Sequence, residues 1–178
     1  GSELSENFST TSDETKSNFN TWIQGNYNDS NYFEDLDQCL NDLSADKPEI
    51  DYKITNDDDA LYIYTSGTTG NPKAATISHK RLRLMMLGFK GAIQPNKNDR
   101  VYNVLPLYHS AGGVIAVGLA LTSGASLVLK RKFSVNEFWD DVHKYKVTIF
   151  QYIGELCRYL LNAPFHRYEK DHNLRMVT

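Results

Sequence analysis

The residues best suited to chemistry form one polar, glycine-rich run, Tyr64–Lys73, which reads YTSGTTGNPK. Its two glycines allow backbone conformations that other residues avoid, and its four aliphatic hydroxyls can donate hydrogen bonds to anionic oxygens. Lys73 adds a positive charge at the end of the run. A short β-rich stretch, Ala60–Tyr64, precedes the run and can hold it in place. The pattern is typical of a loop that binds the β- and γ-phosphates of a nucleotide.

This run matches neither of two common phosphate-binding motifs. A Walker A loop requires the pattern G-x-x-x-x-G-K-[ST], whereas Gly70 is followed by Asn71 and Pro72. The dinucleotide-binding pattern G-x-G-x-x-G is absent from the run as well. A loop rich in glycine, serine and threonine is often only a turn, so its function depends on the elements that position it.

Charge is divided unevenly along the chain, which has 178 residues and a net charge of −3. Residues 1–59 hold fifteen acidic and three basic residues, and residues 60–178 hold seven acidic and sixteen basic residues. The basic part suits an anionic ligand such as a nucleotide, CoA or a lipid headgroup. A solvated charged face explains the same excess equally well. No nucleic-acid-binding motif accompanies the charge, so we expect no nucleic acid partner.

The composition predicts a folded domain with an ordinary apolar core. The chain is 40% hydrophobic, and its length fits one domain of about 100–200 residues. Its two cysteines are too few for a disulfide framework. The most apolar stretch, residues 114–129, is interrupted by glycine and serine and is shorter than the ~20 residues that a membrane span needs. We expect no secretory signal and no span, and hence a soluble segment.

Residues 1–59 are predicted to form an acidic, partly disordered segment. Its first twenty residues hold few apolar anchors. Apolar spacing predicts a short helix over residues 32–43. Asp57–Asp59 close the segment, and a polar turn before a strand is the simpler interpretation of them than a metal site.

Residues 60–178 show alternating strand and helix patterns, which predict an α/β fold with a mainly parallel sheet and flanking helices. Ser78 is suited to cap a helix that begins near His79, and Ser134–Glu137 has the form of a capping box. Phe133 and Phe138 are spaced for a hydrophobic staple. We expect strands over residues 60–64, 101–105, 125–129, 147–152 and 174–178, and helices over residues 79–93, 114–121, 135–145 and 155–162.

Ser66–Lys73, together with Ser78 and His79, resembles the AMP-binding signature of the adenylate-forming superfamily. That superfamily includes acyl-CoA synthetases, luciferases and the adenylation domains of peptide synthetases. More narrowly, Leu105–Gly112 and Gln151–Asn162 resemble the fatty acid transport protein and very-long-chain acyl-CoA synthetase family. The resemblance extends over residues 60–178, a partial AMP-binding domain, and does not reach residues 1–59.

The resemblance implies an enzyme, an ATP-dependent fatty acid:CoA ligase coupled to fatty acid uptake. In that family the carboxylate attacks the α-phosphate of ATP, pyrophosphate leaves, and the CoA thiol then displaces AMP from the acyl-adenylate. The implied substrates are a long-chain or very-long-chain fatty acid, ATP and CoA, with Mg²⁺ to neutralise the polyphosphate. The implied fold is part of the N-terminal domain of an adenylate-forming enzyme.

The same resemblance implies roles for individual residues. It implies that Lys73 and His109 are catalytic, with His109 beside the substrate carboxylate, although a histidine satisfied by the local backbone is an alternative. Packing in the core is the alternative for Tyr108, and a helix N-terminal charge is the alternative for Glu155. No metal ligand is assigned. The implied phosphate-binding residues are Thr65, Ser66, Gly67, Thr68, Thr69 and Gly70, and the implied substrate-binding residues are Tyr108, Tyr152, Gly154 and Glu155.

We expect this chain to be a truncated piece of a larger synthetase. The family's later motifs, for adenine, Mg²⁺, ribose and a C-terminal catalytic lysine, have no counterpart before Thr178. Such a piece is expected to be inactive alone, and the alternative function is a non-catalytic module that binds a nucleotide or a partner. The intact protein is expected at endoplasmic reticulum, peroxisomal or plasma membranes, associated through other regions, with its catalytic part facing the cytosol.

Overall fold

The computed structural model of the chain describes residues 21–25, 33–65, 71 and 73–178. The chain divides into two compact units, Gly1–Tyr52 and Lys53–Thr178. The predicted disorder of the first twenty residues falls outside the described residues. The functional prediction concerns the second unit.

The first unit contains a short parallel strand pair and a helix. Strand β1 (Trp22–Ile23) pairs with β2 (Glu34–Asp35), and helix α3 (Leu36–Asn41) follows directly. The Asp35 carboxylate accepts a hydrogen bond from the backbone N–H of Gln38 and so caps α3. The short helix predicted for this segment is therefore confirmed, although it begins later than expected because β2 takes up the preceding residues.

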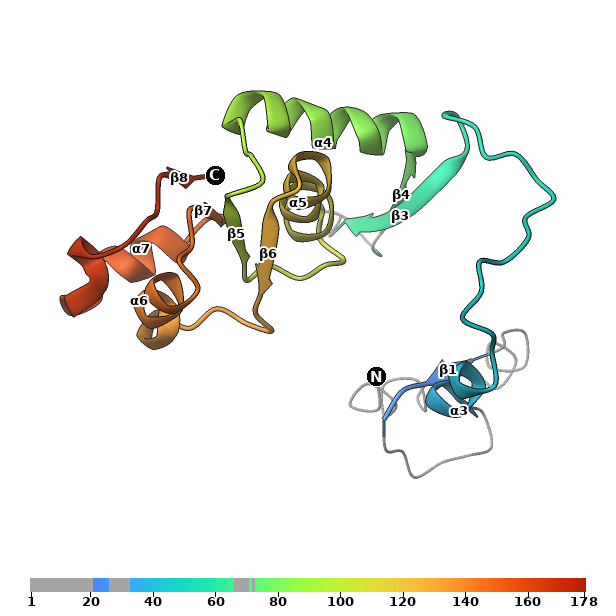
Figure 1. Ribbon diagram of the computed structural model, residues 1–178, viewed down its shortest axis with the longest axis horizontal. Helices are drawn as coiled ribbons and strands as arrows, with labels where there is room; N and C mark the ends of the chain where they lie inside the picture. The colour runs from blue at the N-terminus through green and yellow to red at the C-terminus, as the bar shows by residue number, and fades with distance from the viewer. Residues whose placement is uncertain (1–20, 26–32, 66–70, 72) are drawn as a thin grey trace. The chain divides into compact units, whose positions relative to one another are not determined.

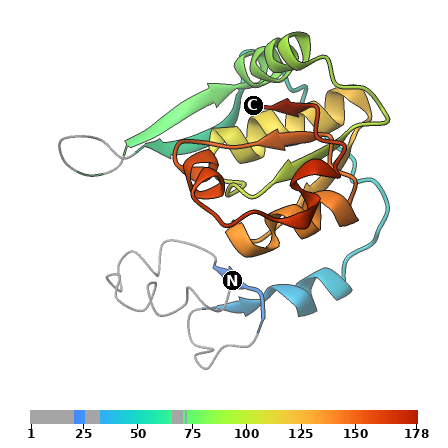
Figure 2. The same cartoon turned by 90° about the vertical axis from the view of Figure 1, so that its left-hand side faces the viewer.

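The second unit begins with a polar turn and an antiparallel hairpin. The Asp58 carboxylate accepts a hydrogen bond from the Thr55 backbone N–H at 2.6 Å, and this bond lowers the pKa of Asp58. Strands β3 (Asp59–Thr65) and β4 (Lys73–Ser78) then pair along their length. Figure 2 shows the two strands side by side, with β4 leading directly into α4. The turn before the first strand confirms the simpler interpretation of the acidic cluster.

Strand β4 is a part of the fold that sequence reasoning missed. Its sequence KAATIS contains two alanines and a lysine, which have little preference for strands. Pairing with β3 decides its conformation, because β3 offers backbone partners to every residue of β4, with one register shift between Asp59 and Leu61. The hairpin is also an antiparallel addition to a fold that was expected to be mainly parallel.

Helix α4 (His79–Ile93) begins at the predicted cap. The Ser78 hydroxyl accepts a hydrogen bond from the Arg81 backbone N–H at 3.3 Å. The helix ends at Gln94, whose φ of 51° is left-handed. Its more buried apolar residues recur at three- and four-residue intervals, as in a helix that covers a core; they are Leu82, Met85, Met86, Phe89 and Ile93.

A four-stranded sheet forms the centre of the second unit. Its strands are β5 (Arg100–Asn103), β6 (Ser126–Leu129), β7 (Ile149–Gln151) and β8 (Met176–Val177). They are arranged in the order β6-β5-β7-β8, and every neighbouring pair is parallel. The predicted parallel sheet is confirmed, and so are its strands, each shorter than expected.

Helices cover both faces of this sheet (Figure 1). Helix α4, the π-helix η2 (Ser110–Ala116) and α5 (Val117–Ser123) lie on one side. Helices α6 (Val135–Lys144) and α7 (Leu156–Leu161) lie on the other. The 3-10 helix η3 (Arg167–Lys170) precedes β8. This layering confirms the α/β class.

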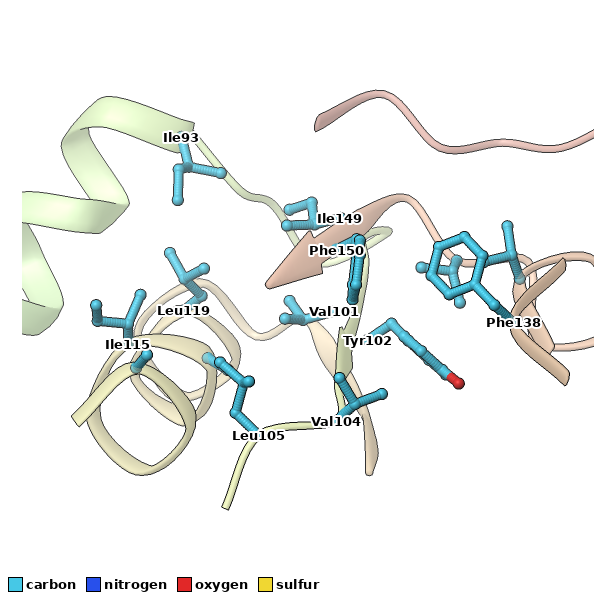
Figure 3. Close-up of a cluster of buried hydrophobic side chains, with 14 residues drawn as sticks. Ile93, Val101, Tyr102, Val104, Leu105, Ile115, Leu119, Phe138, Ile149 and Phe150 are labelled. Atoms are coloured by element: carbon cyan, nitrogen blue, oxygen red, sulfur yellow. The ribbon is translucent and has the colours of Figure 1, made fainter. Parts of the chain in front are cut away.

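The core lies where the helices meet the sheet, with strand β5 at its centre (Figure 3). Val101 and Tyr102 point to opposite faces of the sheet, Val101 toward Leu119 and Tyr102 toward Phe138. The rings of Tyr102 and Phe138 meet edge to face, with centroids 5.8 Å apart. These four side chains are fully buried, so the central strand contacts both helical layers.

A buried polar network links the sheet to helix α6. The Tyr102 hydroxyl donates a hydrogen bond to the Asp141 carboxylate at 2.8 Å, and Lys130 Nζ lies 2.8 Å from the same carboxylate. Burial raises the pKa of Tyr102, and the hydrogen bond to Asp141 raises the pKa of Lys130. The network supplies partners for a carboxylate that would otherwise be costly to bury.

The predicted capping box before α6 is wrong. Ser134 occupies the cap position, but its side chain makes no capping hydrogen bond. The Glu137 carboxylate instead accepts a hydrogen bond from Lys130 at 3.3 Å, so a tertiary ion pair replaces the local bond. The staple is present, because the rings of Phe133 and Phe138 lie 6.1 Å apart. Separately, none of the helices in the described parts of the chain is long and apolar enough to span a bilayer.

Candidate functional site

The hairpin β3–β4 positions the two ends of the predicted phosphate loop. Thr65 and Lys73 are paired in register at its tip, and the Thr65 hydroxyl donates a hydrogen bond to the Lys73 carbonyl at 3.3 Å. Both residues are exposed. The two ends of the predicted loop are therefore fixed by pairing between strands. The other predicted phosphate-binding residues lie outside the described residues; they are Ser66, Gly67, Thr68, Thr69 and Gly70.

A second set of predicted residues follows strand β5. The strand ends at Asn103, whose fully buried side chain forms hydrogen bonds with both backbone groups of Leu105. A turn then brings the His109 N–H to 3.1 Å from the Pro106 carbonyl. Asn103 therefore fixes the path of the chain from the sheet to Tyr108 and His109.

His109 caps the π-helix η2. Its Nδ1 accepts a hydrogen bond from the Ala111 backbone N–H at 3.1 Å. Since Nδ1 must then be unprotonated, the proton of the neutral ring is on Nε2, which can donate a hydrogen bond. The side chain is exposed. The local backbone thus satisfies one ring nitrogen, and the other is available for chemistry.

Tyr108 does not pack in the core. Its side chain is 83% exposed, the largest exposed fraction among the described tyrosines. An exposed aromatic ring beside His109 can form a wall for an apolar substrate. Tyr108 is therefore not part of the core formed by the described residues, and substrate binding by it stays a prediction.

Two glycines hold the His109 loop tightly against η2. A Cβ added to Gly112 would lie 2.5 Å from the Pro106 carbonyl oxygen, and one added to Gly113 would overlap the Leu107 carbonyl oxygen. Any larger residue at these positions must displace the loop. Close approach of the backbone therefore accounts for glycine at both positions.

The third set of predicted residues follows strand β7. The Tyr152 N–H donates a hydrogen bond to the Thr178 carbonyl at 2.8 Å, so Tyr152 is attached to the end of β8. Gly154 has a left-handed φ of 53°, which favours glycine. Glu155 is exposed and forms an ion pair with Arg158 at 2.5 Å. Glu155 stands at the N-terminus of α7, and its ion pair fits the alternative of a helix N-terminal charge; substrate binding by Glu155 stays a prediction.

The structure brings the second and third sets together. Asn103 and Gln151, the last residues of β5 and β7, are partners in register. The loops that carry His109 and Glu155 therefore leave the sheet at the same edge, where open parallel sheets bind ligands. Among the described residues, no hydrogen bond or ion pair joins Thr65 or Lys73 to these loops.

Two buried amides were missed by sequence reasoning. Asn103 is fully buried, and Gln151 is 3% exposed with its Oε1 unpartnered within the described residues. The available signal is a polar residue that ends an otherwise apolar strand, as in Val101–Asn103 and Ile149–Gln151. Such residues lie at the edge of the sheet where a ligand is expected.

We predict that His109→Ala lowers the free energy of unfolding by about 1 kcal/mol, because it removes a helix cap. His109→Asn should retain most of that stability, since a short polar side chain can still accept a hydrogen bond from Ala111. Urea denaturation followed by circular dichroism measures both. Equal destabilisation by the two variants would contradict the capping role.

Comparison with known proteins identifies the family. Residues 5–178 match the family described as AMP-binding enzyme. The chain belongs to the AMP-binding enzyme family. It is 51% identical to mouse (Mus musculus) long-chain fatty acid transport protein 3 over 120 residues, and 50% identical to human (Homo sapiens) long-chain fatty acid transport protein 1 over 121 residues. These alignments cover 67% and 68% of this chain but only 18% and 19% of the relatives.

The fold also resembles that of a solved AMP-binding enzyme structure. ATP-bound MatB from Rhodopseudomonas palustris superposes with a TM-score of 0.70 at 27% identity. The superposition covers 80% of this chain and 27% of MatB. The chain therefore has the fold of part of an AMP-binding enzyme, as the resemblance implied, and it spans about a fifth of the length of the curated relatives named above.

Proposed function

We propose that this chain is part of an ATP-dependent fatty acid:CoA ligase for long-chain or very-long-chain fatty acids. The observation that carries the proposal is the identity to long-chain fatty acid transport proteins, 51% over 120 residues and 50% over 121 residues. The exposed ends of the hairpin and the exposed His109 loop support it, since both remain accessible to a ligand. The parent protein couples this reaction to fatty acid uptake at a membrane.

The proposed reaction has two steps. A carboxylate oxygen of the fatty acid forms a bond to the α-phosphorus of ATP, and the bond to pyrophosphate breaks. The sulfur of CoA then bonds to the acyl carbon, AMP leaves, and the thiol proton passes to solvent. Neither step needs a covalent bond to the protein, so positioning and electrostatic stabilisation supply the rate enhancement.

Each part of the site has a role in this proposal. Hydroxyls of Thr65–Gly70 hold the β- and γ-phosphates, and Lys73 stabilises the charge on the departing pyrophosphate. The Nε2–H of His109 donates a hydrogen bond to the carboxylate and keeps it in line with the α-phosphorus. Tyr108 and Tyr152–Glu155 contact the acyl chain.

Mg²⁺ is implied by the family's chemistry, and the described residues do not offer a site of their own for it. No group of three or more histidine, cysteine or acidic side chains in the described ranges is close enough together to hold a metal ion. No step of the reaction is therefore assigned to protein-bound metal in this part of the chain.

Calorimetric titration of Mg-ATP into the 178-residue chain tests the nucleotide site. We expect saturable binding that weakens about ten-fold or more in Ser66→Ala/Thr69→Ala, because two charge-assisted hydrogen bonds are lost. Lys73→Gln should weaken binding as well. Thr76→Ala is the matched control, since it removes a hydroxyl from the same hairpin but outside the loop.

The outcomes separate the proposal from its alternative. Binding that depends on the loop, together with ATP–pyrophosphate exchange in a longer protein that contains this segment, supports the ligase. Binding without exchange in the longer protein supports a non-catalytic nucleotide-binding module. No binding by the folded chain would overturn a role for this segment as a nucleotide half-site.

A further inference from the structure

The outer side of helix α4 has an unusual composition. Figure 1 shows that, within the described part of the second unit, no other element lies over this side of the helix. Leu84 and Leu87 are exposed there by 59% and 45%. An apolar hollow of about 230 Å³ lies beside them. It is lined by Leu84, Met85, Gly88, Phe89 and Ala92.

Two glycines of α4, Gly88 and Gly91, lie near these leucines. A Cβ added to Gly88 or Gly91 would meet no atom within 4 Å, so both glycines face open space. At exposed positions away from the ends of a helix, alanine would make the helix more stable than glycine does. Because glycine has no side chain, nothing projects from these positions to cover the leucines or the hollow.

Basic side chains surround the leucines. Lys80, Arg81 and Arg83 are exposed, and α4 contains no acidic residue. Lys90 is turned away, because its Nζ donates a hydrogen bond to the Thr122 carbonyl of α5. Asp58 is the acidic group next to the start of the helix, and its carboxylate is engaged by the Thr55 N–H.

We propose that this side of α4 docks on an anionic lipid surface. Leucines surrounded by long basic side chains suit a bilayer interface, where the leucines enter the headgroup region and the cations contact lipid phosphates. Apart from His79 at its start, every polar side chain of α4 is a lysine or an arginine. The proposal does not depend on nucleotide chemistry, so it can fail or succeed independently of the ligase.

Flotation of the 178-residue chain with vesicles tests the proposal. The probes are vesicles of phosphatidylcholine alone and vesicles that also contain phosphatidylserine. We expect binding to the anionic vesicles only, and weaker binding at high salt because of screening. Arg81→Gln/Arg83→Gln should weaken it about twenty-fold, since each basic residue near an anionic surface contributes about five-fold. Leu84→Ser/Leu87→Ser should weaken it about ten-fold.

Matched controls remove the same groups from other surfaces. Lys97→Gln/Lys144→Gln removes two exposed lysines, and Leu121→Ser/Leu161→Ser removes two leucines that are 73% and 84% exposed. Both should bind anionic vesicles within about two-fold of the original chain, because screening limits the influence of distant charges. Circular dichroism of each variant confirms that it is folded.

Three results would overturn the proposal. The first is the absence of binding to phosphatidylserine vesicles, and the second is an equal loss of binding in the α4 variants and their controls. The third is binding of polyglutamate, but not of vesicles, through Arg81 and Arg83, which would assign this side of the helix to an acidic protein partner instead.

Discussion

Asp99→Asn is expected to lower the free energy of unfolding by about 2 kcal/mol, because it breaks the ion pair between the buried Asp99 carboxylate and the partly exposed Arg175. Asp99 is 3% exposed, and its carboxylate accepts hydrogen bonds from Arg175 Nε at 2.9 Å and from Arg175 Nη2 at 2.6 Å. The backbone and side-chain N–H groups of Asn96 and the hydroxyl of Thr148 also donate to it. Since every neighbour is a donor, the amide –NH₂ of asparagine would face other donors.

The effect of this substitution should depend on pH. The hydrogen bond from Arg175 lowers the pKa of Asp99 from its ordinary value of 3.8 to about 2. A carboxyl whose pKa is lower in the folded state stabilises the fold fully above its unfolded pKa, and that contribution is lost as pH falls toward the folded value. The difference between the original chain and the variant should therefore be constant near neutral pH and shrink from about pH 4 to pH 2.

Urea denaturation at several pH values measures both effects. Asp140→Asn is the control, since Asp140 is exposed and lies 3.8 Å from the exposed Arg167. Such a surface pair contributes less than about 1 kcal/mol. A loss at Asp99 no larger than the loss at Asp140, or one that does not change at low pH, would contradict the role assigned to the ion pair.

Gly113→Ala is expected to destabilise the chain by about 2–3 kcal/mol, because the added methyl group overlaps the Leu107 carbonyl. A backbone group cannot rotate away as a flexible side chain can, so the loop that carries His109 must move. The hydrogen bond between His109 and the Ala111 N–H should weaken with it. Urea denaturation measures the stability, and hydrogen exchange of the Ala111 amide reports on the loop.

A glycine-to-alanine substitution in α4 should have the opposite effect on stability. Gly91 lies within α4 and faces open space, so Gly91→Ala should stabilise the chain by about 0.5–1 kcal/mol. A neutral Gly113→Ala, with unchanged protection of Ala111, would show that the loop is not held by the close packing described above.

Much of the fold follows from patterns that are local in the chain. The alternation of apolar segments predicted the parallel strands and most helices, because each needs only its own periodicity and end signals. Ser78 is an example, since a cap forms within one helical turn. Local reasoning failed at Ser134, where Lys130 binds the carboxylate that was expected to complete the capping box.

In the candidate site, too, features that are local in the chain were predicted, and features that depend on distant contacts were missed. The run Tyr64–Lys73 predicted phosphate binding by its composition alone, and that assignment stays a prediction. The buried amides Asn103 and Gln151 were missed, because nothing in either segment reveals that their strands are partners in register. The ion pair of Glu155 was missed as well.

By itself, the sequence predicted the α/β class and the order of the parallel strands and most helices; the phosphate-binding role of one loop stays a prediction. Only the tertiary structure decided that β4 is a strand, that Gly113 packs against Leu107, and that Arg175 reaches Asp99 across 76 positions of the chain. Local conformation depends on neighbouring residues, whereas contacts between distant segments depend on strand register and helix packing, which no single segment encodes.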